Sequence, residues 1–121
     1  MSLMTPLNRV LGLGTAKGAA EHWWLQRVTA IALLPLGLWL AYALLTLPGF
    51  DYASVTAWVQ QPVTSILLIL LVVAISYHSA LGVQVVIEDY VPGNGMKAAT
   101  LVVSTLAHVG LGVAGVFAVV K

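Results

Sequence analysis

The chain has 121 residues, of which 60% are hydrophobic, five are Lys or Arg and four are Asp or Glu. A soluble domain of this size needs far more charged surface, so the composition excludes that class and is compatible with one membrane domain, residues 1–121. The absence of cysteine excludes disulfides and iron–sulfur clusters held by this chain alone. The sequence has no basic patch of the kind that would indicate a nucleic-acid partner.

The few charges leave three charge-free windows, at 28–50, 52–87 and 98–120. Each is longer than the roughly 20 helical residues that cross a hydrocarbon core. The sequence therefore predicts an all-α membrane protein with three transmembrane helices, at about 28–47, 63–87 and 98–120. The first run is too long for the core of a signal peptide, so we expect a permanent span.

The N-terminal part has a mixed character. Proline and glycine argue against one continuous helix over residues 1–20, where they stand at Pro6, Gly12, Gly14 and Gly18. Trp23 and Trp24 are typical of an interfacial anchor in a segment that leads helically into the first span. Pro35 lies inside that span and predicts a kink, because proline lacks the amide N–H of a regular helix.

The later boundaries follow from proline, glycine and polar residues. Residues 50–61 predict an interfacial loop or a short surface helix. The second span begins near Pro62, a favoured first-turn residue, and the breaker at 92–95 follows its polar end. In the third span, Gly110 and Ala114 form a small pair four residues apart, which permits close helix packing in lipid.

The basic residues predict the orientation of the spans. With the N-terminus inside, four of them lie on the inner side: Arg9, Lys17, Arg27 and Lys97. The outer side holds only Lys121. The positive-inside rule therefore predicts a cytoplasmic N-terminus and a periplasmic C-terminus. It also predicts that Arg27 and residues 88–90 lie at the same, cytoplasmic, face.

His78 is a candidate functional residue because it lies deep in an apolar span. It is ten residues from Glu88, or roughly 15 Å along a helix. Haem iron takes a neutral imidazole nitrogen as axial ligand, and Gly82, one turn later, leaves a thin face for a flat macrocycle. A histidine hydrogen-bonded to Ser or Thr of a neighbouring helix is equally compatible with the residue type.

The end of the second span carries Glu88, Asp89 and Tyr90. A carboxylate and a phenol at the membrane rim can hydrogen-bond a ligand carbonyl and move protons. A solvated helix end with an interfacial tyrosine is the simpler interpretation of the same residues. Arg27 has two similar interpretations, as a snorkelling anchor or as the partner of an anionic group.

The remaining histidines carry weaker signals. His22 stands beside the tryptophan pair, and its residue type leaves its role open. His108 lies near the middle of the third span, where we expect a packed histidine hydrogen-bonded near Ser104 and Thr105. A metal site shared by His78 and His108 stays open as an alternative.

The joint order of these features resembles a known family. The opening Gln26-Arg27-Val28-Thr29-Ala30, His78 in the second span and Asp89-Tyr90 after it are similar to the small hydrophobic membrane anchor subunit of bacterial succinate dehydrogenase. This enzyme is the respiratory complex II, in the form with two anchor chains and one haem b. The resemblance covers nearly the whole chain.

The resemblance implies roles by position. It makes His78 the axial ligand of haem iron, with the second ligand from the other anchor chain, a cytochrome b subunit. Tyr90 is implied to hydrogen-bond a ubiquinone carbonyl, with Asp89 beside it, and Arg27 to lie near the haem propionates and the quinone pocket. His22 roughly matches a family histidine, whereas His108 has no counterpart.

The implied function is anchoring of the flavoprotein and iron–sulfur subunits to the bacterial inner membrane, with electrons passing from succinate to ubiquinone. The isolated chain is expected to have no dehydrogenase activity, because it contains no flavin site and no cluster ligands. Two alternatives stay open: a haem-free structural or assembly subunit of a membrane complex, and a small proton-coupled transporter subunit.

Overall fold

The computed structural model describes residues 16–121, which form four helices and, within that range, no strand. The helices are α2 (Ala16–Thr46), α3 (Tyr52–Val59), α4 (Pro62–Tyr90) and α5 (Asn94–Val120). The described part of α2 from Ala20, all of α4 and all of α5 are long and apolar enough to cross a membrane. The predicted all-α architecture with three spans is therefore confirmed.

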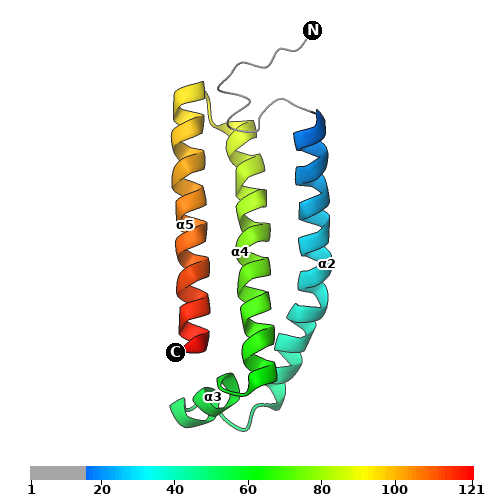
Figure 1. Cartoon of the computed structure of the whole chain (residues 1–121), viewed down its shortest axis with the longest axis vertical. Helices are drawn as coiled ribbons and strands as arrows, with labels where there is room; N and C mark the ends of the chain where they lie inside the picture. Colours follow the sequence, from blue (N-terminus) through cyan, green and yellow to red (C-terminus); the bar gives the residue numbers. More distant parts are fainter. Residues whose placement is uncertain (1–15) are drawn as a thin grey trace.

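The three long helices stand side by side, with α4 between α2 and α5 (Figure 1). Because consecutive helices are antiparallel, the start of α2, the end of α4 and the start of α5 lie at one end of the molecule. The short helix α3 lies at the other end, beside the start of α4. Helix α4 is in contact with each of the other three helices.

Helix α2 begins earlier than the predicted span. It starts at Ala16 and contains Gly18, so the helix continues through a glycine that was expected to interrupt it. A single helical glycine costs only about 1 kcal/mol relative to alanine, and the adjacent alanines favour the helix. The expectation for residues 1–15 lies outside the described residues. Pro35 is inside α2, and the helix axis bends in its C-terminal half (Figure 1).

Of the two alternatives expected for residues 50–61, an interfacial loop or a short surface helix, the structure has the helix, α3. Its N-cap is Asp51, whose Oδ2 accepts a hydrogen bond from the Ser54 amide at 3.1 Å. Hydrogen bonds from Ser54 lower the pKa of Asp51 below its ordinary value, because they stabilise the ionised carboxylate. The rings of Trp39, in the C-terminal half of α2, and Trp58 of α3 stack with centroids 6.1 Å apart, so α3 also contacts α2.

Helix α4 has Pro62 in its first turn, as predicted, and ends at Tyr90. The three polar residues 88–90 therefore form the last helical turn, three residues beyond the predicted end of the span at 87. The chain then turns sharply at Gly93, whose φ of +79° is readily adopted only by glycine. This turn places the start of α5 beside the end of α4.

Two glycines of α5, Gly112 and Gly115, let it pack closely on α4. A Cβ at Gly115 would lie 2.7 Å from Cγ1 of Val72, and one at Gly112 would lie 3.4 Å from the Ser76 hydroxyl. A Cβ at Gly110 would meet nothing within 4 Å. Gly110 and Ala114 lie on another face of α5 and do not pack on α4. Close packing of this pair against another membrane helix stays a prediction.

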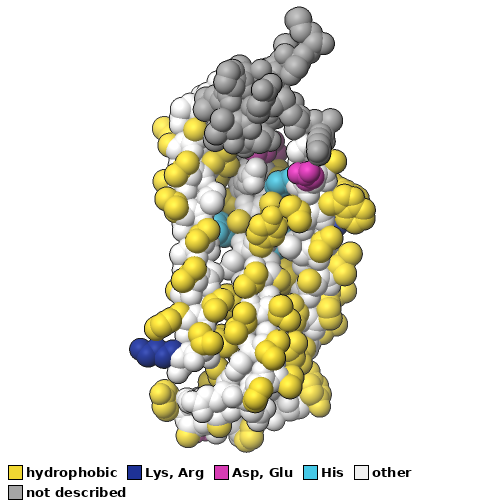
Figure 2. Space-filling model, in the orientation of Figure 1, with side chains coloured by type: hydrophobic (Ala, Val, Ile, Leu, Met, Phe, Trp, Pro, Cys, Tyr) yellow, Lys and Arg dark blue, Asp and Glu magenta, His cyan; other side chains and the backbone are white. Residues whose placement is uncertain are grey.

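The helices bury little of their surface against each other. Among the side chains that the structure describes, the buried ones are Ala43, Thr64, Leu81 and Ile87. Apolar side chains cover the length of the visible face in Figure 2, with acidic groups near its upper end. This exposed apolar surface suits contact with lipid and with other membrane helices.

Candidate functional site

His78 is held between α4 and α2. Its Nδ1 lies 2.9 Å from Oγ1 of Thr29, which is a hydrogen bond between two membrane-spanning helices. No residue in 16–121 lies within hydrogen-bond distance of Nε2 of the same ring. The ring therefore has one nitrogen occupied by α2 and the other without a partner in the described part of the chain.

His108 has a different environment. Its Nδ1 lies 2.8 Å from the Ser104 carbonyl oxygen, and its Nε2 lies 3.1 Å from the Ser79 hydroxyl on α4. A carbonyl only accepts, so Nδ1 donates and Nε2 of the neutral ring accepts from Ser79. Both nitrogens are thus occupied, which confirms the expected packed histidine at Ser104. It also leaves no free ring nitrogen for a metal site shared with His78.

The helix face of α2 above Thr29 is polar. His22, Gln26 and Thr29 follow at spacings of four and three residues, so they share one face. The Gln26 amide nitrogen lies 3.9 Å from where a Cβ of Gly82 would stand, so this face meets α4. His22 Nε2 and Gln26 Oε1 are buried and have no hydrogen-bond partner among the described residues. The space beside Gly82 is therefore occupied by α2.

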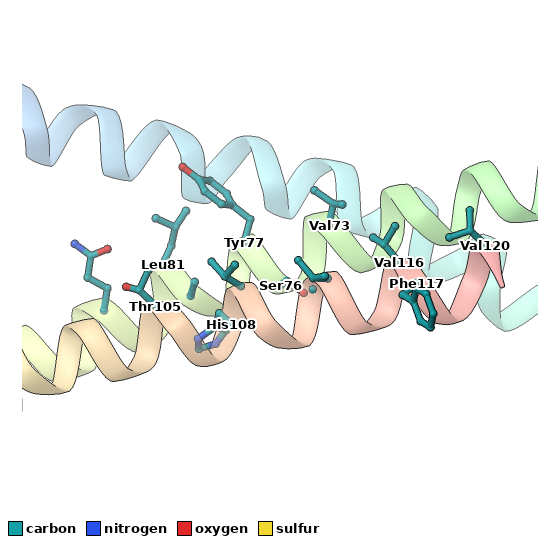
Figure 3. Close-up of a pocket in the computed structure, with 14 residues that line it drawn as sticks. Val73, Ser76, Tyr77, Leu81, Thr105, His108, Val116, Phe117 and Val120 are labelled. Atoms are coloured by element: carbon teal, nitrogen blue, oxygen red, sulfur yellow. The ribbon is translucent and has the colours of Figure 1, made fainter.

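A groove of about 700 Å³ runs along α4 and α5. Figure 3 shows Thr105 and Leu81 toward one end, His108 and Tyr77 near the middle, and Val120 at the other end. Valine is the commonest residue in its walls. Among its polar side chains, the His108 ring is hydrogen-bonded to Ser79 and the Gln84 amide to Glu88. The groove is therefore a largely apolar surface with a few polar groups.

Arg27 lies close to the level of His78 but on another side of α2. It is two residues from Thr29, about 3 Å along the axis and 200° around it. Its guanidinium carbon lies 5.1 Å from the centre of the Trp23 ring, so the side chain extends toward the start of α2. The structure thus places Arg27 and His78 at similar depth without bringing their side chains together.

The polar end of α4 is farther from His78. Tyr90 is twelve residues beyond it, about 18 Å along the helix, and 80% of its side chain is exposed. Asp89 is also exposed, whereas Glu88 is half-buried and accepts a 3.0 Å hydrogen bond from Gln84. In the last turn of α4, Asp89 and Tyr90 thus have no side-chain hydrogen bond to residues 16–121. The backbone of Arg27 is about 15 Å deeper than that of Tyr90.

The histidine and carboxylate groups do not converge into a metal site of their own. Among the described residues, no three of His, Cys, Asp and Glu lie close enough to hold a metal ion together. A haem axial site needs one imidazole nitrogen from a helix, and His78 Nε2 fits that need. The sequence predicts no role for Thr29, Gln26 or Ser79. The spacing of His22, Gln26 and Thr29 at i, i+4 and i+7 could have indicated a polar face on the first span.

Three apolar spans, with the His78 imidazole hydrogen-bonded between two of them, define a multi-pass membrane subunit. The model of the succinate dehydrogenase/fumarate reductase transmembrane subunit family matches residues 1–119, and the chain belongs to this family. The predicted resemblance is thus confirmed at the family level.

Relatives agree with this membership. The chain is 40% identical over 84 residues to the succinate dehydrogenase hydrophobic membrane anchor subunit of Rickettsia bellii, covering 69% of this chain and 67% of the relative. The Rickettsia conorii protein of the same name is 36% identical over 94 residues, 77% and 75% of the two chains. The Paracoccus denitrificans subunit is 27% identical over 124 residues, 93% and 96%. These matches support a membrane anchor subunit of succinate dehydrogenase, a multi-pass protein of the bacterial inner membrane.

Proposed function

We propose that this anchor subunit supplies an axial ligand to a haem b shared with a second anchor subunit, and that its cytoplasmic end forms part of a ubiquinone-reduction site. The partners are the second anchor chain, which is the cytochrome b subunit, and the iron–sulfur and flavoprotein subunits. The observation that carries the proposal is the His78 ring, whose Nδ1 is bound by Thr29 and whose Nε2 has no partner within residues 16–121.

His78 has the chemistry that the haem needs. A neutral imidazole offers the lone pair of one nitrogen while the other nitrogen is hydrogen-bonded, which fixes the ring. A bound b-type haem supplies one-electron transfer at a potential set by its axial ligands and its burial. His108 does not compete for this role, because Ser79 and Ser104 occupy both of its nitrogens.

Asp89 and Tyr90 are proposed to contact ubiquinone. Reduction of a quinone to a quinol takes two electrons and two protons, and negative charge develops on the carbonyl oxygens. The Tyr90 phenol donates a hydrogen bond to one of those oxygens and stabilises the charge. Asp89, the next carboxylate along the same helix end, accepts and passes a proton. Both side chains are exposed in this chain, as groups that meet a ligand between subunits need to be.

Arg27 is proposed to pair with an anion beside α2, such as a haem propionate, or to line the edge of the quinone pocket. Among the Arg and Lys residues in 16–121, Arg27 is the one whose backbone lies closest to the level of His78. The Trp23 ring beneath it orients the cation, since an aromatic face attracts a guanidinium.

The test of the haem ligand is a reduced-minus-oxidised visible spectrum of the complex, purified in detergent through a tag on this chain. The natural chain is expected to give a six-coordinate b-type signal, and His78→Ala is expected to lose or alter it. His108→Ala is the matched control, because it removes a mid-span histidine with both nitrogens occupied. An unchanged spectrum in His78→Ala would overturn the ligand assignment, and a complex without haem would favour the structural-subunit alternative.

The test of the quinone site is succinate:ubiquinone activity of Tyr90→Phe. This change removes only the hydroxyl that donates the hydrogen bond, and removal of one such donor typically slows a reaction about 100-fold or more. Succinate oxidation with a soluble acceptor, which does not use the quinone site, is expected to be unchanged. Equal quinone reduction in Tyr90→Phe and in the natural complex would contradict the assignment.

A further inference from the structure

We infer that Thr29 is the positioning residue for the haem ligand: its hydroxyl oxygen accepts the Nδ1 proton of His78 and so leaves the Nε2 lone pair for iron. This inference rests on the proposed function of His78 as axial ligand. It goes beyond that function because it names a residue of a different helix, Thr29, that orients the imidazole ring and makes it a stronger electron donor.

The first step is the direction of the hydrogen bond. The Thr29 hydroxyl lies 2.7 Å from the Leu25 carbonyl oxygen and 3.0 Å from the Gln26 carbonyl oxygen, both on its own helix. A hydroxyl has one proton, and carbonyl oxygens only accept. That proton therefore goes to the backbone of α2, and Oγ1 faces His78 with a lone pair. The Nδ1 of His78, 2.9 Å away, must then be the donor.

The second step is the consequence for the ring. A neutral imidazole with its proton on Nδ1 carries its free lone pair on Nε2. An acceptor on the N–H side makes a metal-bound imidazole a stronger electron donor, and it fixes the plane of the ring. A stronger donor stabilises the oxidised iron more than the reduced iron, so Thr29 lowers the haem midpoint potential.

The third step is the comparison with His108. This ring also donates from Nδ1 to an oxygen, the Ser104 carbonyl, but Ser79 then donates to its Nε2. The two histidines thus have the same proton position and differ in what faces Nε2. Thr29 gives Nδ1 of His78 an acceptor, and Nε2 has no hydrogen bond to residues 16–121, so its lone pair is available to a ligand-binding role.

The experiment compares Thr29→Val, Thr29→Ser and Thr46→Val in the complete complex. Valine keeps the shape of threonine but cannot accept the Nδ1 proton, whereas serine keeps the hydroxyl. Thr46 is the matched control because its hydroxyl also donates to backbone carbonyls of α2, those of Tyr42 and Ala43. Unlike Thr29, it has no hydrogen bond to a histidine among residues 16–121. The readouts are the haem midpoint potential from a redox titration and the haem content per complex.

The expected result is a higher midpoint potential and weaker haem retention in Thr29→Val, by about 10- to 100-fold in affinity. Thr29→Ser and Thr46→Val are expected to match the natural complex. If Thr29→Val has the natural potential and retention while His78→Ala loses the haem, the inference fails and the proposed ligand stands. If His78→Ala also keeps the haem, the proposed function itself fails.

Assembly is measured first, by recovery of the other subunits. A Thr29→Val chain that recovers no partners, while Thr46→Val recovers them, would also overturn the inference. Thr29 would in that case be a packing residue of α2 and α4, and its effect on the haem would be indirect.

Discussion

Two hydroxyl groups separate the chemistry of the two mid-span histidines. The sequence shows His78 and His108 as similar residues in apolar helices, and helical spacing alone cannot tell which ring is free. The difference arises from Thr29 and Ser79, which reach the rings from neighbouring helices. Because such contacts depend on helix rotation and register, they become visible only when the helices are packed.

Ser79→Ala is therefore expected to affect stability without affecting the haem. The change leaves Nε2 of His108 without its donor between α4 and α5, and the loss of such a hydrogen bond costs about 0.5–1.5 kcal/mol. The measurement is the thermal unfolding midpoint of the detergent-purified complex, with its visible spectrum recorded on the same sample. A lost haem signal in Ser79→Ala would contradict the assignment of His108 as a structural residue.

The proposed site residues were predicted unevenly from the sequence. Apolar surroundings marked His78, and the polar helix end marked Asp89 and Tyr90, but their proposed contacts lie with other molecules and stay predictions. Thr29 belongs to the motif that resembles the family, but the sequence predicts no role for it. Its role follows from a distance to another helix, 49 positions away in sequence, which no local pattern contains.

At the scale of elements, the sequence predicted the number of spans and the bounds of the second and third, but it did not predict the early start of the first span or the faces by which the helices touch. Helix length follows from hydropathy and from breakers such as the turn at Gly93, so α4 and α5 have nearly the predicted bounds. The face of α5 that meets α4 could not be assigned, because glycine and alanine occur around the whole helix. The structure selects Gly112 and Gly115 over Gly110 and Ala114.

Gly115→Ala is expected to destabilise the α4–α5 contact. The added methyl would stand 2.7 Å from Cγ1 of Val72, and the stiff β-branched valine cannot move away freely. Overpacking of this kind costs about 1–3 kcal/mol. Thermal unfolding of the complex measures the effect.

Gly110→Ala is the control for that substitution. It adds the same methyl to the same helix, where nothing lies within 4 Å. Alanine favours a helix over glycine, so its unfolding temperature is expected to be equal to or slightly above the natural one. Equal destabilisation by both changes would show that the methyl acts on something other than the α4 contact.

At the scale of the whole molecule, the arrangement of the ends makes the orientation testable. The sequence has no cysteine, so a single introduced thiol is the only cysteine of this chain that a maleimide can label. Gly95→Cys reports the end where α5 starts, and Gln60→Cys reports the end where α3 lies. The positive-inside rule predicts that the first thiol is cytoplasmic and the second periplasmic.

The measurement uses a membrane-impermeant maleimide on cells with a permeable outer membrane and an intact inner membrane. We expect labelling of Gln60→Cys in intact cells and labelling of Gly95→Cys only after disruption of the inner membrane. The natural cysteine-free chain is the blank. The reverse pattern would contradict the predicted orientation and would place Asp89 and Tyr90 on the periplasmic side.

The sparse burial of the chain has a consequence for how the cell produces it. Helix α4 touches both other spans, yet few side chains are buried and most large apolar ones face outward. A fold of this kind gains much of its stability from molecules bound to its sides, so the folded fraction rises with their concentration. The supply of partner subunits, rather than the synthesis of this chain, then sets how many copies persist in the membrane.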